Sequence, residues 1–145
     1  DSAIHHFDIF STIASAAKTK SSNENELDGV NLLPYIKNEK SSEPHKTLFW
    51  RSGNHQSVLH ENWKYIISKK ENFRWLFDTS VDPLEKNNLI ESHTEEARLI
   101  EELLVKFNSE QKDPLFPPSY DAPIMIDKYD GQEYKEGDEY IYWSN

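Results

Sequence analysis

Four short runs of large apolar residues lie close together in the middle of the chain, at residues 46–51, 55–60, 63–68 and 73–78. Each run is rich in aromatic and β-branched residues, and polar turns separate the runs, which is typical of an antiparallel meander. In the third run, Trp63, Tyr65 and Ile67 share one face by alternation. The fourth run is apolar on both faces, which indicates a strand that is central or covered on both sides. The pattern therefore predicts a four-stranded antiparallel sheet.

An amphipathic pattern follows the sheet and predicts a helix over residues 93–108. Its apolar positions recur at three- and four-residue spacing, at Ala97, Ile100, Leu104 and Phe107. They therefore form one stripe along the helix. Ser92 and Glu95 have the spacing of a capping box at its start. We expect this helix to lie across one face of the sheet.

A shorter helix is predicted ahead of the sheet, over residues 4–18. Its apolar residues share one face: Ile4, Phe7, Phe10, Ile13, Ala14 and Ala17. Asp8, with Ser11 and Thr12, offers capping chemistry near its start. Because this face has no helical partner, we expect it to pack on another surface. Residues 27–36 follow as a compact apolar element, in which Pro34 permits only the first turn of a helix.

The end of the chain is predicted to be extended. Four prolines lie between residues 114 and 123, and residues 127–139 are largely polar and acidic. Residues 140–143 form an apolar patch that is suited to an edge strand. Within the sheet, the turn at Glu61-Asn62 lacks glycine, and we expect residue 62 to take a positive φ there.

Composition narrows the possible partners. The 145 residues carry a net charge of −10, which argues against nucleic acid and against an anionic membrane surface. No apolar run reaches 18 residues, so no membrane-spanning helix is predicted. There is no cysteine, which excludes disulfides, thiolate catalysis and cysteine-based zinc sites. Only 36% of the residues are hydrophobic and the first is not Met, so we expect a processed or truncated piece of something larger.

Residue types that bind metals occur in two places, and neither pattern is specific. Asp78, Asp82 and Glu85 form an acidic cluster whose oxygens suit a cation. Asp side chains also close local turns, and we favour that interpretation. His55 and His60 lie five residues apart on one strand, so their side chains point to opposite faces and do not form a metal pair. We therefore predict no metal site.

Several short motifs follow one another in order, at Asp8-Ile-Phe-Ser-Thr12, Leu27-Asp-Gly-Val-Asn-Leu-Leu-Pro-Tyr35, Thr47-Leu-Phe-Trp-Arg51, Asn62-Trp-Lys-Tyr65, Leu76-Phe-Asp-Thr-Ser-Val-Asp-Pro-Leu-Glu85 and Asn88-Leu89. As an ensemble, spread over residues 3–107, they resemble the C-terminal part of the type I sulfatases, of the arylsulfatase kind. One departure is Ser11-Thr12, where the family usually has Pro-Thr.

The family's catalytic signature, Cys or Ser followed by x-Pro-Ser-Arg, is absent from the chain, and Pro118-Ser119-Tyr120 does not match it. In the family, a formylglycine made from that Cys or Ser is the nucleophile, and calcium binds the sulfate. The resemblance implies both groups for the intact enzyme, and no catalytic or metal-binding residue in this chain. It thus implies a fragment that supports sulfate-ester hydrolysis without being catalytic alone, with the N-terminal catalytic domain as its partner.

The expected fold is α+β in three segments. Residues 1–44 would be the end of the large, alkaline-phosphatase-like α/β domain and a connector. Residues 45–112 would be the C-terminal subdomain, with the four-stranded antiparallel sheet and its helix, and residues 113–145 a Pro-rich, extended acidic tail. The resemblance also suggests a secreted or periplasmic location.

Basic residues at one end of the sheet are the candidates for contact with a substrate. Arg51, His55 and Lys69 lie in or beside the loops at 52–55 and 68–72. In a sulfatase-like setting they would help to hold a sulfated small molecule or sugar, because ion pairs to sulfate oxygens are strong. The alternative is that these side chains are simply solvated at the surface.

Two other functions stay open. Trp50, Trp63 and Trp75 would stack on sugar rings if they lay on one exposed face, which would make the chain a carbohydrate-binding module. Alternatively, the first helix and residues 140–143 would dock a partner, which would make it a protein-interaction module. A large apolar patch around Phe7, Phe10 and Ile13 would indicate that a domain is missing.

Overall fold

The computed structural model describes residues 2–19, 27–52, 55–69, 72–113, 115–116, 124–125 and 140–141. The chain divides into two compact units, Asp1–Leu48 and Phe49–Asn145. Within the described residues, no helix combines the length and the apolar character that crossing a membrane requires.

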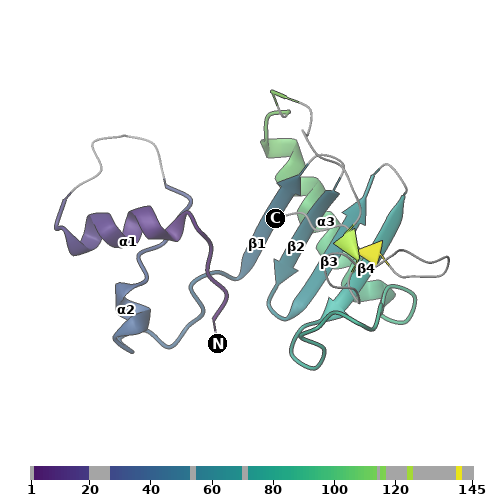
Figure 1. The fold of residues 1–145 in the computed structure, drawn as a ribbon, viewed down its shortest axis with the longest axis horizontal. Coiled ribbons are helices and arrows are strands. Elements are labelled where there is room, and N and C mark those ends of the chain that lie inside the picture. Colours follow the sequence, from purple (N-terminus) through teal and green to yellow (C-terminus); the bar gives the residue numbers. More distant parts are fainter. Residues whose placement is uncertain are drawn as a thin grey trace. The chain divides into compact units, whose positions relative to one another are not determined.

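The first unit contains two helices, α1 (Asp8–Ala16) and α2 (Leu33–Ile36) (Figure 1). α1 is shorter than the predicted helix over residues 4–18, because residues 4–7 and 17–18 lie outside it. Pro34 lies in the first turn of α2, as its missing N–H requires. Three large side chains of α1, Ile9, Phe10 and Ile13, are 58%, 59% and 62% exposed. Phe10 and Ile13 belong to the predicted apolar face and are largely uncovered, and Ile9 adds to this exposed surface although the prediction did not include it. Ile4 and Phe7 of the predicted face lie before the helix.

The capping predicted for α1 is wrong. Phe7 is the N-cap residue, and no side chain caps the helix. The two hydroxyls instead bind the segment that precedes α2: Ser11 Oγ donates to Gly29 O at 2.7 Å, and Thr12 Oγ1 accepts from Leu32 N at 3.0 Å. These side chains thus bond to backbone about twenty residues away. A purely local interpretation had assigned them to the helix end.

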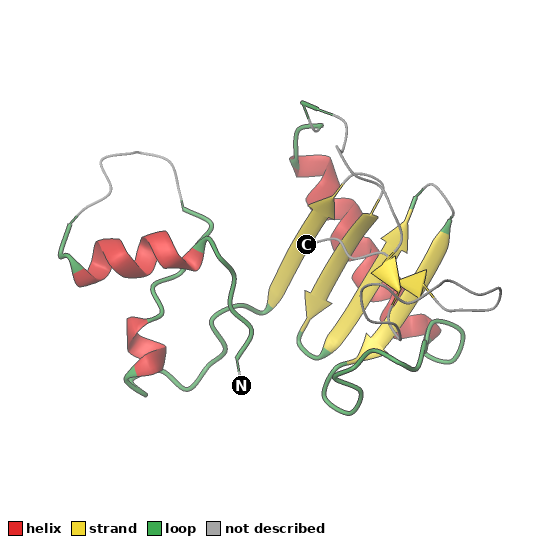
Figure 2. Ribbon diagram, in the orientation of Figure 1, coloured by secondary structure: helices red, strands yellow, loops and turns green. Residues whose placement is uncertain are grey.

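The second unit is built on one antiparallel sheet with strand order β1-β2-β3-β4 (Figure 2). The strands are β1 (Thr47–Ser52), β2 (His55–His60), β3 (Trp63–Ser68) and β4 (Phe73–Asp78), and the boundary between the units falls inside β1. Helix α3 (Thr94–Glu110) crosses one face of the sheet and contacts β2 and β3. The predicted α+β fold, with four antiparallel strands and an amphipathic helix, is confirmed.

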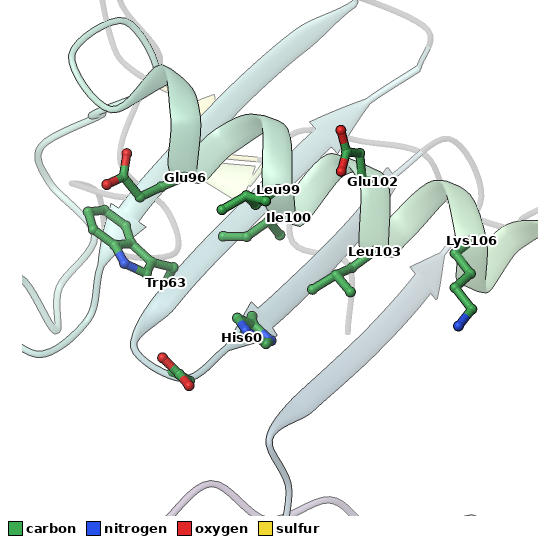
Figure 3. A pocket seen from close by; sticks show the side chains of 9 residues that line it. His60, Trp63, Glu96, Leu99, Ile100, Glu102, Leu103 and Lys106 are labelled. Carbon is green, nitrogen blue, oxygen red and sulfur yellow. The ribbon is translucent and has the colours of Figure 1, made fainter.

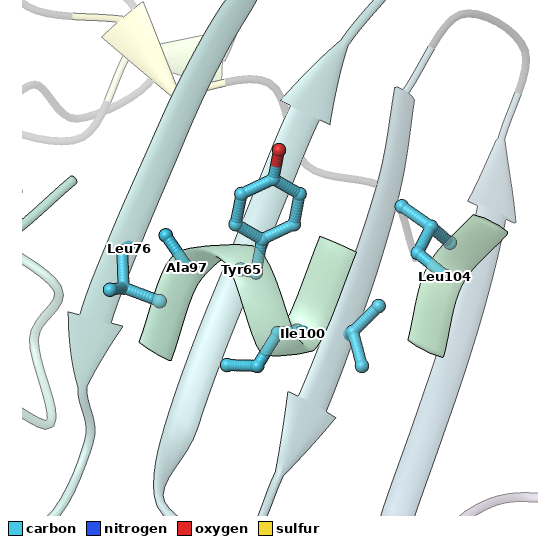
Figure 4. Close-up of a cluster of buried hydrophobic side chains, with 6 residues drawn as sticks. Tyr65, Leu76, Ala97, Ile100 and Leu104 are labelled. Atoms are coloured by element: carbon cyan, nitrogen blue, oxygen red, sulfur yellow. The ribbon is translucent and has the colours of Figure 1, made fainter. Parts of the chain in front are cut away.

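The main core lies between α3 and the sheet. Buried side chains come from three strands and from the inner stripe of the helix (Figure 4): Val58, Tyr65, Leu76, Ala97, Ile100 and Leu104. At one end, the rings of Phe49 and Phe107 stack with 4.3 Å between their centroids. The helical stripe read from the sequence is therefore the face that packs on the sheet.

β4 is an edge strand of this sheet, yet both of its faces are covered at its centre. Leu76 is fully buried on the α3 side, and Phe77 is 1% exposed on the other side, where it packs with Ile66. Of the two interpretations of its sequence, a central position is wrong and coverage on both sides is confirmed.

The capping box at the start of α3 is also wrong. The helix begins at Thr94 with His93 as its N-cap residue. Ser92 therefore lies one residue too early, and its hydroxyl donates to Leu89 O at 3.2 Å. The backbone of Leu89 fixes this entry, because Ser92 N and His93 N also donate to Leu89 O.

The turn between β2 and β3 holds the two residues predicted, since His60 pairs with Trp63. The positive φ, however, belongs to Glu61, at 55°, and not to residue 62. At the chain end, Tyr140–Ile141 (β6) pairs with Ile124–Met125 (β5) in a separate two-stranded sheet, so it is not an edge of the main sheet. Most of the Pro-rich stretch and the acidic run at 127–139 lie outside the described residues.

Replacing Glu61 by Gly should stabilise the second unit by about 1 kcal/mol, because a residue with a Cβ is strained at positive φ. Urea unfolding followed by tryptophan fluorescence measures this, since every Trp lies after residue 48. The same substitution at exposed Glu91, whose φ is not positive, serves as the control and should not stabilise. Equal changes in the free energy of unfolding for both variants would contradict the strain attributed to the positive φ of Glu61.

Candidate functional site

The three predicted substrate-contact residues meet at one end of the sheet. Arg51 is near the end of β1, His55 begins β2, and Lys69 directly follows β3. The register pairs His55 with Ser68, so Lys69 lies next to the start of β2. The fold thus brings together residues that lie up to eighteen positions apart in the sequence.

Their side chains differ in direction and exposure. Phe49 packs on α3, so alternation along β1 puts Arg51 on the α3 face. The Arg51 guanidinium donates from Nη2 to Lys112 O at 3.4 Å, just beyond the end of α3. His55 is 5% exposed and lies on the opposite face, because its neighbour Gln56 bonds to Asn108 of α3. Lys69 is exposed.

The acidic cluster closes local turns, as the sequence suggested. Asp78 Oδ1 accepts from Ser80 N at 3.0 Å, and Asp82 Oδ2 accepts from Asn87 N at 2.8 Å. The hydrogen bond from the Asn87 backbone is the main reason that the pKa of Asp82 lies below its usual value. Glu85 pairs with Lys64 at 2.7 Å. Each carboxylate therefore has a partner within the fold.

The described residues offer no set of ligands for the calcium ion, and the sequence offers no position for the formylglycine, that the resemblance implies for the intact enzyme. Among the residues that the structure describes, no three His, Asp or Glu side chains come close enough to hold a metal ion. The carboxylates of the acidic cluster bind backbone and lysine nitrogens instead. The sequence also lacks the Cys/Ser-x-Pro-Ser-Arg motif in which a formylglycine would form. No chemical step is therefore assigned to this chain.

The tryptophans do not form one stacking platform. Trp63 packs against the core under α3, whereas Trp75 packs against Ile66 and Phe77 on the other face. Trp50 follows Phe49 in β1, so it lies on the face away from α3. The three tryptophans therefore do not share one face, although Trp50 and Trp75 lie on the same one.

A buried carboxylate organises the first unit, and the sequence interpretation missed its role. Asp8 is 0% exposed. Its Oδ2 accepts from His5 N at 2.8 Å, and its Oδ1 accepts from Val30 N at 2.9 Å. His45 Nε2 lies 2.8 and 2.9 Å from the two oxygens, so it donates to the ionised carboxylate. One side chain thus joins α1 to segments 22 and 37 residues away.

Two opposing effects act on the pKa of Asp8. Burial raises it, because a low-dielectric surrounding disfavours the charged form. The hydrogen bonds from His5, Val30 and His45 lower it by stabilising the carboxylate, and together they prevail. The pKa of Asp8 therefore lies below its ordinary value, and the group is ionised at neutral pH.

Glycine 29 is required by the same close packing. A Cβ at Gly29 would lie 2.2 Å from Phe7 O, a backbone atom that cannot move aside cheaply. The Asp-Gly-Val motif therefore has a structural cause. Only a residue without a side chain lets the 27–32 segment approach the start of α1 closely enough for the Val30–Asp8 hydrogen bond.

The later motifs also hold the fold together. Lys64 and Glu85 form a largely buried ion pair that joins β3 to the loop after β4. Asn88 Oδ1 accepts from Leu76 N at 2.9 Å, and Asn88 Nδ2 donates to Arg74 O at 3.2 Å. The Asn88 side chain therefore makes, at the edge of β4, the hydrogen bonds that the backbone of a neighbouring strand would otherwise make. The motif residues determine structure, and none of these contacts carries chemistry.

A groove of about 500 Å³ lies beside α3 (Figure 3). Its apolar residues are Trp63, Leu99, Ile100 and Leu103. Polar residues complete its lining: His60, Glu61, Glu96, Glu102 and Lys106. The sequence did not predict this groove, because the turn between β2 and β3 and the flank of α3 beside it meet only in the folded chain.

Solved structures share this fold. Among solved structures, Ps i-CgsB superposes with a TM-score of 0.65 at 21% identity, over 81% of this chain and 27% of that chain. BT1596, a 2-O GAG sulfatase, superposes with a TM-score of 0.54 at 22% identity, over 70% of this chain and 23% of that chain. At these identities the superpositions establish a shared fold. The fold is that of one part of the sulfatases.

One relative also resembles this chain in sequence. The uncharacterized sulfatase YdeN of Escherichia coli (strain K12) is 40% identical over 50 residues, which are 34% of this chain and 9% of YdeN. No family model matches the chain. The chain spans about a quarter of the solved relatives and about a tenth of YdeN. In sequence and fold it resembles the C-terminal part of type I sulfatases.

Proposed function

We propose that these residues form the C-terminal part of a sulfuric ester hydrolase and support sulfate-ester hydrolysis in the intact enzyme without being catalytic alone. The observation that carries the proposal is the sulfatase-like sheet and helix, in a chain without the catalytic signature. Calcium and a formylglycine would belong to the N-terminal catalytic domain. A secreted or periplasmic location goes with this proposal.

The exposed face of α1 supports it. Ile9, Phe10 and Ile13 are each more than half exposed on one short helix. Burying such side chains stabilises a protein by about 2 kcal/mol each. A helix that leaves them in water is better explained as one that packs on a further domain. Divisions at residues 44–45 and 112–113 are part of the same proposal.

Sulfate release tests the proposal directly. The 145-residue chain and the longest product of the same gene should be purified side by side and assayed on p-nitrophenyl sulfate and on sulfated glucosamine. The longer protein should release sulfate, and the 145-residue chain should release none. Activity of the short chain would overturn the proposal, as would a longer product that lacks the Cys/Ser-x-Pro-Ser-Arg signature.

Within this proposal, Arg51, His55 and Lys69 are residues on the substrate side of the intact enzyme, where a sulfated sugar would bind. Arg51 and Lys69 would hold the anion by charge-assisted hydrogen bonds. His55, which is nearly buried, would position the β1–β2 loop and would not touch the substrate. BT1596, which has the same fold, is described as acting on a glycosaminoglycan.

Replacing Arg51 by Ala in the intact enzyme should lower kcat/KM on a sulfated sugar by about tenfold, the worth of one hydrogen bond to a charged group. The matched control is Arg98→Ala, which removes an exposed arginine that pairs with Glu95 and Glu102 on α3. The control should leave kcat/KM unchanged. Equal values for wild type and Arg51→Ala on every sulfate ester cleaved would remove Arg51 from the site.

A further inference from the structure

The face of the main sheet that points away from α3 is as deeply buried as the face that packs on the helix. Tyr65 and Leu76 meet α3, so alternation along the strands puts Ile66 and Phe77 on the opposite face. Ile66 is 2% exposed and Phe77 is 1% exposed. Neighbours within a sheet flank such side chains but do not lie above them. A second layer must therefore cover this face.

The described residues supply little of that second layer. Among them, Trp75 is the apolar side chain that packs on Ile66 and Phe77. Trp75 pairs with Ile66 across β3 and β4, so it flanks Ile66 within the sheet. The Lys64–Glu85 ion pair also lies on this face, because Lys64 is paired with Phe77 in the register. One flanking aromatic ring and one ion pair do not make an apolar layer, so another segment of the chain provides it.

Within the second unit, the sequence leaves one source for the layer. This unit runs from Phe49 to Asn145 and so includes the chain end. Outside the described residues it holds the loop positions Gly53-Asn54 and Lys70-Glu71, which have no large apolar side chain, and most of residues 114–145. The chain end is rich in large apolar and aromatic residues: Tyr120, Ile124, Met125, Ile126, Tyr129, Tyr134, Tyr140, Ile141, Tyr142 and Trp143. It is therefore the segment with the composition to cover a sheet face.

The chain end is also well placed and long enough. Arg51 Nη2 donates to Lys112 O at 3.4 Å, so the chain end starts beside the last residues of β1. A sheet of four strands is about 15 Å wide, a distance that about five extended residues cross. Residues 113–145 are several times longer than that. In addition, two strands such as β5 and β6 are only marginally stable alone and need a surface on which to pack.

We propose that the chain end, residues 117–143 with the β5–β6 pair, is the second cover of the main sheet and lies over Ile66 and Phe77. This cover closes the face to which Trp50 and Trp75 belong, so neither a sugar chain nor a further domain binds there. The proposal does not depend on sulfate-ester hydrolysis, so it stands or falls separately from the function proposed above.

The test uses the whole 145-residue chain with ¹³C-labelled isoleucine methyl groups and no substitution. In nuclear Overhauser spectra, the Ile66 δ1 methyl should show contacts to protons of residues after Lys112. A spectrum in which Ile66 contacts only residues before Lys112 would overturn the proposal. In a mixture of labelled and unlabelled chains, the contacts should stay within one chain. Contacts between chains would assign the cover to a second copy and would also overturn the proposal.

A double variant of β6 measures what the cover contributes. Tyr140→Asn and Ile141→Asn are made together, because adjacent residues of a strand point to opposite faces and one of the two then meets the main sheet. The pair should raise the equilibrium constant of unfolding by about tenfold or more, the worth of one buried apolar side chain. Urea unfolding followed by tryptophan fluorescence measures the constant. The Ile66 methyl resonance should shift in the same variant.

The matched control removes one aliphatic and one aromatic residue from the same chain end. Leu115 and Phe116 are 89% and 80% exposed, so Leu115→Asn with Phe116→Asn should leave the unfolding constant and the Ile66 methyl resonance unchanged. Equal changes in the two double variants would overturn the proposal. None of these results bears on whether the longer gene product hydrolyses sulfate esters.

Discussion

Replacing Asp8 by Asn is expected to release the 27–32 segment and His45 from α1. The carboxylate accepts from three donors, His5 N, Val30 N and His45 Nε2. Asn has one acceptor oxygen, and its NH₂ group would face a donor. Because these groups are buried, we expect the first unit to lose about 3 kcal/mol of local stability.

Hydrogen exchange measures this loss where it occurs. The amides of Val30 and Leu32 donate to Asp8 and Thr12, so exchange at these two sites reports opening of the segment. A loss of 3 kcal/mol corresponds to exchange about 100-fold faster. Asp28→Asn, in the neighbouring exposed position, is the matched control and should leave both amides protected. Unchanged protection in Asp8→Asn would refute the role given to the carboxylate.

The same network should make the first unit sensitive to acid. The pKa of Asp8 is lowered from 3.8 in the folded chain. Its contribution to stability is therefore fully present above that value and is lost as pH falls through the lower, folded value. In the wild type, the protection factors of Val30 and Leu32 should fall together over this range. In Asp8→Asn they should be low throughout and should not change with Asp8's titration.

Replacing Ile100 by Ala should destabilise the second unit by about 3 kcal/mol. Ile100 is 2% exposed and packs under the sheet with Val58, Tyr65 and Leu76. Truncation removes buried methyl and methylene groups and leaves a cavity that a sheet on one side and a helix on the other cannot close. Urea unfolding followed by tryptophan fluorescence gives the change in the free energy of unfolding.

The adjacent residue provides the control for this prediction. Leu99 is 54% exposed, and alanine is at least as favourable as leucine in a helix. Leu99→Ala should therefore change stability by less than about 0.5 kcal/mol. If the two neighbouring substitutions cost the same, α3 does not present the face to the sheet that the structure describes.

The sequence predicted strands and helices well where one hydrophobic pattern continues over the whole element. Alternation in 63–68 and the spacing of Ala97, Ile100 and Leu104 each state which side chains meet the core, because burial of one face is a local property of the chain. Caps were not predictable in this way. Ser11, Thr12 and Ser92 have the right chemistry for a cap, but distant or preceding backbone groups bind them instead.

The sequence by itself determined the four-stranded sheet, its covering helix, the absence of the sulfatase signature and the set of motifs that resemble the sulfatases. Only the tertiary structure shows which contacts the residues of those motifs make. The pairs Asp8–His45 and Lys64–Glu85 join residues 37 and 21 positions apart. The tertiary structure likewise decided that one flank of α3 and the β2–β3 turn form a groove. Such contacts depend on how elements that are distant in sequence pack together, and a local hydrophobic pattern does not contain that information.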